Sequence, residues 1–275
     1  VLERVKVAKY NIEDLLYLMS RLRDPVDGCP WDIKQDFNTI VAHTIEEAYE
    51  LADAIANDDK QHIKEELGDV LFQVIFYAQI GKEQGDFDFT AVVSQLVDKL
   101  IRRHPHVFPD GVLQARFGEQ REDVSAIKQN WEAIKSVERQ GKQQSSVLDD
   151  VPVSLPAMTR SIKLQKRAAN IGFDWPNIDG VVEKLHEELN ELQEAREQLD
   201  SAAIASEFGD VLFCLGNLAR HLKLDPESAL RGSNGRFEQR FRYIEKQLAT
   251  QGLSPEQASL AEMDALWDKA KQLGL

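Results

Sequence analysis

The chain has 275 residues, and its 47 acidic residues outnumber its 33 basic residues, so the formal net charge at neutral pH is −14. Nucleic-acid backbones and anionic membranes are bound by basic surfaces, so this charge argues against both as partners. The hydrophobic content of 43% is typical of a globular protein, and no uninterrupted apolar run is long enough to span a membrane. The first residues lack the apolar core of a signal peptide, and we therefore expect a cytoplasmic protein.

Helical periodicity runs through nearly all of the chain, and no segment alternates apolar and polar residues as a half-buried strand does. We therefore predict an all-α protein. Asn11 with Asp14 is typical of a helix start, and Pro25 is typical of a helix end. The expected helices of the first half are 11–22, 39–57, 60–84, 88–103 and 120–139.

The second half continues with the same pattern. Its expected helices are 156–170, 178–199, 201–222, 226–249 and 255–273. Pro226 and Pro255 are each preceded by a capping residue, which is typical of a first helical position. Residues 141–156 are polar and contain prolines, so we predict a linker there between helical domains at 1–140 and 157–275. Short loops between long amphipathic helices predict an antiparallel bundle in each domain.

One acidic pattern occurs twice in the chain. Glu47-x-x-Glu50 is followed by Glu66-x-x-Asp69, and the same acids recur 141 positions later as Glu188-x-x-Glu191 and Glu207-x-x-Asp210. Glycine and apolar neighbours recur with them, since Glu-Leu-Gly-Asp-Val-Leu-Phe in the first copy becomes Glu-Phe-Gly-Asp-Val-Leu-Phe in the second. This match indicates duplication of one functional unit rather than a chance run of solvated helix acids.

The spacing of these acids predicts a metal site. Acids three residues apart share one face of a helix, and the acidic faces of two consecutive antiparallel helices can meet. Carboxylates gathered beside apolar runs raise one another's pKa and oppose folding unless a cation neutralises them. An all-oxygen, anionic ligand set without cysteine favours Mg²⁺, Mn²⁺ or Ca²⁺ over zinc. The two cysteines, Cys29 and Cys214, have neither zinc-ligand nor disulfide-framework spacing.

Cationic pairs follow each acidic motif at helical spacing. These pairs are Lys99 with Arg103 and Arg236 with Arg240. Arginine forks bind phosphate oxygens well, so a metal on one side and arginine on the other would hold a polyphosphate, although ordinary surface ion pairs are the alternative. Trp267 and Lys271 have the same spacing, and the tryptophan would either stack on a base or close the core.

The chain resembles the MazG family of nucleoside triphosphate pyrophosphohydrolases in its two-domain form, over nearly its whole length. The resemblance lies in Gly28-Cys-Pro-Trp-Asp32, Thr44-Ile-Glu-Glu-Ala-Tyr-Glu50, Glu65-Glu-Leu-Gly-Asp-Val-Leu-Phe-Gln73, Arg102-Arg-His-Pro-His-Val-Phe108, Gly172-Phe-Asp-Trp175, His186-Glu-Glu-Leu-Asn-Glu191 and Arg236-Phe-Glu-Gln-Arg-Phe241. It implies an all-α fold that dimerises. It also implies Mg²⁺-dependent cleavage of nucleoside triphosphates between the α and β phosphates, giving the monophosphate and pyrophosphate.

The resemblance also implies roles for single residues, with the C-terminal domain as the catalytic one. The metal ligands would be Glu188, Glu191, Glu207 and Asp210. The positions around the nucleotide would be Lys184, Glu187, Arg236, Arg240, Trp267 and Lys271. Either Glu187 or Glu191 would accept the proton of the attacking water. A second site would comprise Glu47, Glu50, Glu66, Asp69, Lys99 and Arg103. Ser206 departs from the pattern, because the N-terminal copy has Glu65 there.

Three alternatives remain open from the residues alone. The chain could be a narrower pyrophosphohydrolase acting on dUTP, dCTP or phosphoribosyl-ATP, which a substrate panel would separate. It could be a dimeric regulatory scaffold whose acidic sites hold metal structurally. A di-iron bundle would need Glu-x-x-His on two helices, and only Glu183 with His186 has that spacing in the acidic motifs.

Overall fold

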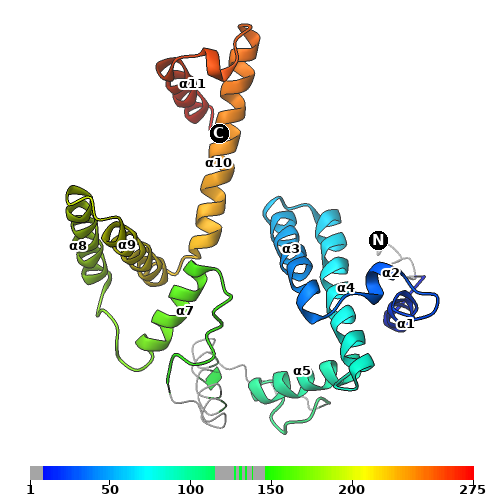
Figure 1. The fold of residues 1–275 in the computed structure, drawn as a ribbon. Helices are drawn as coiled ribbons and strands as arrows, with labels where there is room; N and C mark the ends of the chain where they lie inside the picture. Colours follow the sequence, from blue (N-terminus) through cyan, green and yellow to red (C-terminus); the bar gives the residue numbers. More distant parts are fainter. Residues whose placement is uncertain (1–8, 115–126, 128–129, 132–133, 135–137, 139–145) are drawn as a thin grey trace, which may run out of the picture. The chain divides into compact units, whose positions relative to one another are not determined.

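The computed structural model describes residues 9–114, 127, 130–131, 134, 138 and 146–275 (Figure 1). The chain forms two compact units, residues 1–138 and 139–275, and each is described by itself. The described residues contain helices and turns but no strand, which confirms the all-α prediction. The helix predicted at 120–139 lies mostly outside the described residues. The linker predicted at 141–156 stays a prediction, as does dimerisation.

The first unit is built around a helical hairpin. Its helices are α1 (Ile12–Leu22), α2 (Pro30–Ile33), α3 (Phe37–Ala56), α4 (Lys60–Gln84) and α5 (Phe89–Arg103). Helices α3 and α4 lie side by side, and α1 and α5 also contact α4 (Figure 1). The core lies where α1, α3 and α4 meet, and it consists of Met19, Ile40, Ile75, Phe76 and Ile80. Asn11 and Asp14 form the predicted capping box of α1.

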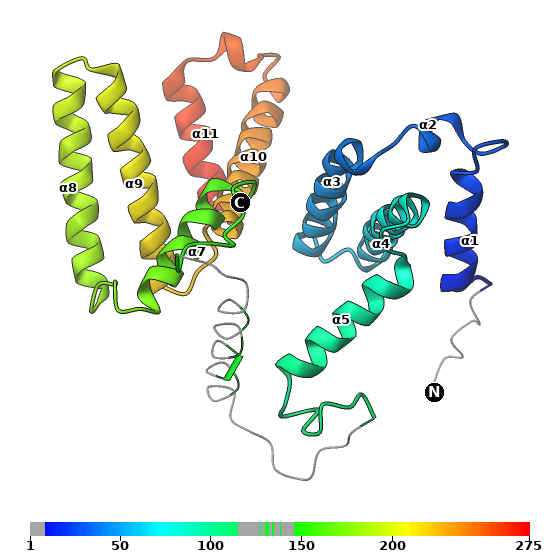
Figure 2. The same cartoon turned by 60° about the horizontal axis from the view of Figure 1, so that its bottom comes forward.

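The second unit contains a hairpin of the same kind. Its helices are α7 (Ala157–Ala169), α8 (Ile178–Glu197), α9 (Ser201–His221), α10 (Pro226–Thr250) and α11 (Leu260–Gln272). Helices α8 and α9 form the hairpin, α7 packs on α9, and α10 pairs with α11 and contacts α7 (Figure 2). The segment before α7 is held on that helix, because Arg167 donates hydrogen bonds to the carbonyl oxygens of Val147 and Asp149.

The turns of the two hairpins repeat as closely as their acids. Asp58 and Leu199 have positive φ angles of 52° and 56°, and the next residue in each copy, Asp59 or Asp200, caps the second helix of its hairpin. A residue in the left-handed conformation lets the chain reverse direction, and the aspartate side chain accepts hydrogen bonds from the free N–H groups of the first helical turn. The two hairpins therefore align their acidic residues in the same register.

One expectation about the helices was wrong, and one short helix was not predicted. The single helix predicted at 255–273 is a short 3₁₀ turn, η1 (Pro255–Gln257), followed by α11. Ala258 is extended, and Ser259 begins α11 with a capping box to Glu262, so a local polar cap interrupts the helical pattern. The short helix α2 was not predicted, because four residues are too few for helical periodicity to show.

Among the described helices, α9 is long and apolar enough to meet a membrane-span criterion. The same helix packs against α7 and α8 and carries Glu207 and Asp210.

Candidate metal centre

The acidic faces of α8 and α9 meet, as predicted. Glu188 from α8 and Glu207 and Asp210 from α9 each offer a carboxylate oxygen, and these oxygens lie within 4.8 Å of one another. Only 6% of Glu188 is exposed, whereas Asp210 is open to solvent, so the cluster is anchored inside the hairpin and accessible from outside. An all-carboxylate set with one solvent-facing side fits Mg²⁺, which keeps part of its water shell.

The first unit repeats this cluster with Glu47, Glu66 and Asp69, whose ligand atoms also lie within 4.8 Å of one another. The Oε2 atom of Glu66 is buried and accepts no hydrogen bond. A buried carboxylate oxygen without a donor is costly unless a cation binds it, so this observation supports metal binding. The other Glu66 oxygen lies 2.8 Å from Nε2 of His62.

The fourth acid of each motif, Glu191 or Glu50, lies outside these groups of three. Burial raises the pKa of Glu191, and the charges of Glu188, Glu187 and Glu207 add to the effect. Burial likewise raises the pKa of Glu47, together with the charges of Asp69, Glu50 and Glu66. The carboxylates of each hairpin therefore repel one another, and a divalent cation would relieve that repulsion.

Lys184 is the cation that the structure places at the C-terminal cluster. Its Nζ atom lies 2.7 Å from Oε1 of Glu188 and 2.9 Å from Oε1 of Glu187, and these contacts raise the pKa of Lys184. The corresponding position in the first unit is His43, whose Nδ1 atom lies 3.6 Å from Glu46. The lysine partly neutralises the C-terminal carboxylates, and its ammonium group can also bind an anionic ligand.

The four residues predicted to contact the nucleotide from α10 and α11 have partners within the C-terminal part of the second unit. Arg240 donates to the carbonyl oxygen of Leu275 at 2.7 Å and stacks 5.3 Å from the Trp267 ring. Lys271 pairs with Asp268 at 3.0 Å, and Arg236 donates to Ser233 at 2.8 Å. In the described part of the chain, no hydrogen bond or ion pair joins these four side chains to the acidic cluster. Their contact with the nucleotide therefore stays a prediction.

In the first unit, Arg103 also has a partner that the sequence did not suggest. Its Nη2 atom lies 2.6 Å from Oε2 of Glu138, and Arg102 binds the other oxygen of the same carboxylate at 2.7 Å. This pairing is the surface alternative that the sequence left open. Neither it nor any described contact brings Lys99 or Arg103 to Glu47, Glu66 and Asp69.

We expect Glu138→Gln to weaken the pH dependence of stability in acid. Arg103 first, and then Arg102, lower the pKa of Glu138 to about 2. A lowered folded-state pKa contributes stability above the ordinary value near 4.5, and this contribution is lost as the pH falls toward 2. Because the site is partly solvated, we expect these ion pairs to contribute only about 1 kcal/mol to the free energy of unfolding.

Urea unfolding at a series of pH values from 7 to 3 measures this contribution of Glu138, with the exposed Glu13→Gln as the control. Identical curves for Glu138→Gln and the unmodified protein would contradict this prediction.

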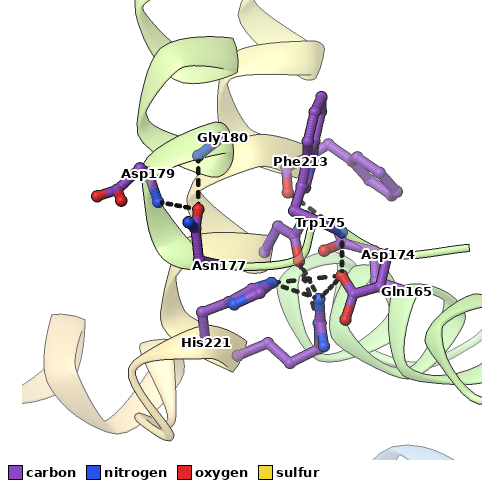
Figure 3. A network of polar contacts seen from close by, with 10 residues as sticks. Gln165, Asp174, Trp175, Asn177, Asp179, Gly180, Phe213 and His221 are labelled. Carbon is purple, nitrogen blue, oxygen red and sulfur yellow. Dashed lines mark hydrogen bonds and ion pairs between the residues drawn. The ribbon is translucent and has the colours of Figure 1, made fainter.

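A cavity of about 690 Å³ adjoins the C-terminal cluster. Glu188, Asp210 and Lys184 line one end, and Asn217 and Arg220 line it elsewhere. Arg220 forms an ion pair with Asp174, and Nε2 of His221 lies 3.3 Å from the same carboxylate (Figure 3). Although burial opposes it, the Arg220 guanidinium holds the pKa of Asp174 below its usual value.

Sequence reasoning did not select this second group of residues. Asp174 and Trp175 stand in the Gly172-Phe-Asp-Trp175 segment, which carried the family resemblance without an assigned role. Asn217 and Arg220 lie two and three turns after Asp210 on α9, and Gln165 lies on α7. The Asp174-Trp175 pair in this segment was the signal in the sequence that could have indicated these residues. The cavity itself depends on how α7 packs on α9, which the sequence does not show.

Comparison with known proteins places these features in a family. The profile of the MazG nucleotide pyrophosphohydrolase domain matches residues 35–108 and 178–243, which include both acidic hairpin motifs. A nucleoside triphosphate pyrophosphohydrolase of Escherichia coli (strain K12) is 48% identical over 264 residues, covering 95% of this chain and 97% of that protein. A protein of Thermotoga maritima named nucleoside triphosphate pyrophosphohydrolase/pyrophosphatase MazG is 42% identical over 267 residues, covering 97% and 98%. The chain therefore belongs to the MazG nucleotide pyrophosphohydrolase family, and it is a hydrolase.

Proposed function

We propose that the protein hydrolyses nucleoside triphosphates at the bond between the α and β phosphates, giving the monophosphate and pyrophosphate, in a Mg²⁺-dependent reaction in the C-terminal unit. The observation that carries this proposal is the convergence of Glu188, Glu207 and Asp210 next to Lys184 and a large cavity. The relatives from Escherichia coli and Thermotoga maritima carry names that describe this activity. The acidic chain disfavours nucleic acid and anionic membranes as partners, and a small phosphorylated substrate would need the metal ion and local cations to offset the negative charge at the site.

Within this proposal, Glu188, Glu207 and Asp210 hold the metal ion, with Glu191 beside them. A bound Mg²⁺ ion supplies charge neutralisation for the phosphates and acidifies a water molecule. Mn²⁺ would suit the same oxygen ligands. Lys184 binds a phosphate oxygen, since its ammonium group already lies at the edge of the cluster.

Glu191 is the stronger candidate to accept the proton of the attacking water. Its carboxylate lies outside the group of three that would hold the metal ion, so it is free to accept a proton beside that ion. Glu187 is the second candidate, but its carboxylate is paired with Lys184 at 2.9 Å.

We also propose that the chain forms a homodimer. Leu189 on α8 and Phe208 and Leu212 on α9 are exposed apolar side chains on the acidic hairpin, and burial against a second copy would remove them from water. Because Arg236, Arg240, Trp267 and Lys271 have no described contact with the acidic cluster of their own chain, a role for them near the phosphates would require the copies on the partner. Sedimentation of the purified protein tests this proposal, and a monomer at micromolar concentration would contradict it.

Product analysis in ¹⁸O-labelled water tests the proposed reaction. We expect pyrophosphate and nucleoside monophosphate in equal amounts when Mg²⁺ and each nucleoside triphosphate are supplied, and no turnover in EDTA. The label should enter the monophosphate, because the attacking water adds to the α phosphorus. Release of orthophosphate without pyrophosphate would show that the bond assignment is wrong, and label found only in pyrophosphate would show that water attacks the β phosphorus instead. The same panel, extended to dUTP, dCTP and phosphoribosyl-ATP, tests for a narrower preference.

A further inference from the structure

The cavity beside the C-terminal carboxylates has the size of a small-ligand site. Its volume of about 690 Å³ lies within the usual range for such sites. Its walls are largely apolar, with side chains from α7, α9 and the segment before α8: Leu164, Ala168, Phe173, Trp175, Phe213 and Cys214. Glu188 and Asp210 belong both to this cavity and to the metal cluster. A ligand bound at the metal can therefore extend into the cavity.

The N-terminal repeat fills the equivalent space with a side chain. Asn217 stands 141 positions after Phe76, which is the same offset that relates the acids of α4 and α9. Phe76 is only 1% exposed and packs in the core of the first unit, with the Arg23 guanidinium 5.3 Å from its ring. The large apolar Phe76 of the first unit thus corresponds to the shorter, polar Asn217 of the second unit, and Asn217 lines the cavity.

Gln165 presents a hydrogen-bond acceptor that no group in the described part of the chain uses. The side chain is 8% exposed, and its Nε2 atom donates to the carbonyl oxygen of Phe213 at 2.9 Å (Figure 3). Because that carbonyl can only accept, the amide nitrogen must point toward it, and the orientation of the amide is defined. The Oε1 atom of Gln165 is then buried without a partner in a residue that lines the cavity. A buried acceptor of this kind is costly unless a ligand donates to it.

Asn217 presents the opposite group. Its Oδ1 atom accepts hydrogen bonds from Nε and Nη2 of Arg220 at 3.0 and 2.7 Å. The amide nitrogen of Asn217 is therefore left to donate toward the cavity that this residue lines. Arg220 is neutralised by Asp174, so this part of the cavity has no net positive charge with which to bind a phosphate.

Trp175 supplies an aromatic wall whose position is defined by its neighbours. Asn177 accepts hydrogen bonds from the backbone of Asp179 and Gly180 and so begins α8 just after the tryptophan (Figure 3). A Cβ atom on Gly180 would lie 2.8 Å from the Trp175 ring, so the glycine permits the ring to pack directly on the helix. A flat heterocycle stacks well on such a ring.

We propose that this cavity binds the base of the nucleoside triphosphate, with Gln165 accepting from and Asn217 donating to the edge of the base and Trp175 lying against its face. The proposal rests on the proposed function, because it assumes a triphosphate at the adjoining metal site. A neutral heterocycle with both a donor and an acceptor matches the two amides and the apolar walls. The acids that line the cavity, Glu188 and Asp210, and the neutralised Arg220 disfavour an anion in the same place.

Gln165→Met tests the proposal in the full-length enzyme. Methionine has nearly the same shape but neither accepts nor donates as the amide does. We expect KM for nucleoside triphosphates to rise at least about tenfold, kcat to change little, and discrimination between bases to weaken. Inhibition by inorganic tripolyphosphate, which has no base, should not change. The control is Gln193→Met, the same replacement on the exposed face of α8.

A second variant gives a readout that needs no catalysis. Asn217→Phe introduces the residue of the first repeat, which the same helix position already accommodates in α4. We expect nucleosides without phosphate to quench tryptophan fluorescence of the unmodified protein, and Asn217→Phe to abolish this quenching. The variant Trp175→Phe identifies the responding ring, and circular dichroism checks the fold. If Asn217→Phe does not fold, the smaller Asn217→Ala replaces it, with weakened quenching expected.

These outcomes separate the two proposals. Absence of pyrophosphate from the unmodified enzyme would contradict the proposed function, while nucleoside quenching would still report on the cavity. If Gln165→Met behaves as Gln193→Met does, with KM and base preference unchanged, and the Asn217 variants still bind nucleosides, then the base does not lie in this cavity.

Discussion

Replacing Glu188 with glutamine is expected to lower Mg²⁺-dependent hydrolysis of nucleoside triphosphates at least a hundredfold. Glu188 is the buried member of the C-terminal cluster, and its carboxylate is shared between the metal position and Lys184. Groups that only support metal ligands typically change activity or affinity by about 10- to 100-fold, so loss of a ligand should cost at least as much. Initial rates with saturating Mg²⁺ measure the effect, and calorimetry with Mg²⁺ alone measures the accompanying loss of metal affinity.

Two further variants make this result specific. Glu194→Gln makes the same chemical change at an exposed position of α8 outside the acidic group and should leave the rate unchanged. Glu47→Gln removes the corresponding ligand of the first unit, and we expect it to retain most of the activity, since catalysis is proposed for the second unit. A large loss in Glu47→Gln together with a normal rate in Glu188→Gln would move the catalytic site to the first unit.

Replacing Arg23 with methionine is expected to destabilise the first unit by about 3 kcal/mol. The Arg23 side chain is 6% exposed, and its Nη2 and Nε atoms lie 2.7 and 3.0 Å from the Glu83 carboxylate. Its Nη1 atom donates to the carbonyl oxygens of Asp32 and Gln35, which connects the α2 segment to α1. Methionine would lose the contact of the guanidinium with the Phe76 ring and all the hydrogen bonds of Arg23. Glu83 would keep only its bond from Gln79, the Asp32 carbonyl would keep its bond from the Gln35 N–H, and the Gln35 carbonyl would lose its Arg23 donor.

Hydrogen exchange resolved by mass spectrometry suits this test, because it reports opening of α4 separately from opening of α9. Faster exchange should appear in α1 and α4 and not in the second unit. Arg21→Met is the matched control on the same helix, since Arg21 pairs with Asp27 in solvent and such exposed pairs contribute little to stability. Equal effects of the two replacements would mean that burial of Arg23 adds nothing to its contribution.

Some features of this protein follow from the sequence because they depend on local spacing. Helical periodicity, capping residues such as Asn11 and the 141-residue repeat predicted most helix positions and the duplicated acidic hairpins. Acids three residues apart must share a helix face, and a short turn must bring consecutive helices together, so the meeting of Glu188 with Glu207 and Asp210 was predictable. The family resemblance was carried by these same local motifs.

The contacts that the sequence did not predict join residues far apart in the chain. The pairing of Arg103 with Glu138, the interaction of Arg240 with Leu275, and the cavity between α7 and α9 all depend on how helices cross. The exchange of Phe76 for Asn217 is visible in the sequence, but its meaning is not, because the side chain fills a core only where α1 packs against α4. Helix periodicity identifies the face that is buried, whereas the partner of that face and the space left between them are set by side-chain packing in three dimensions.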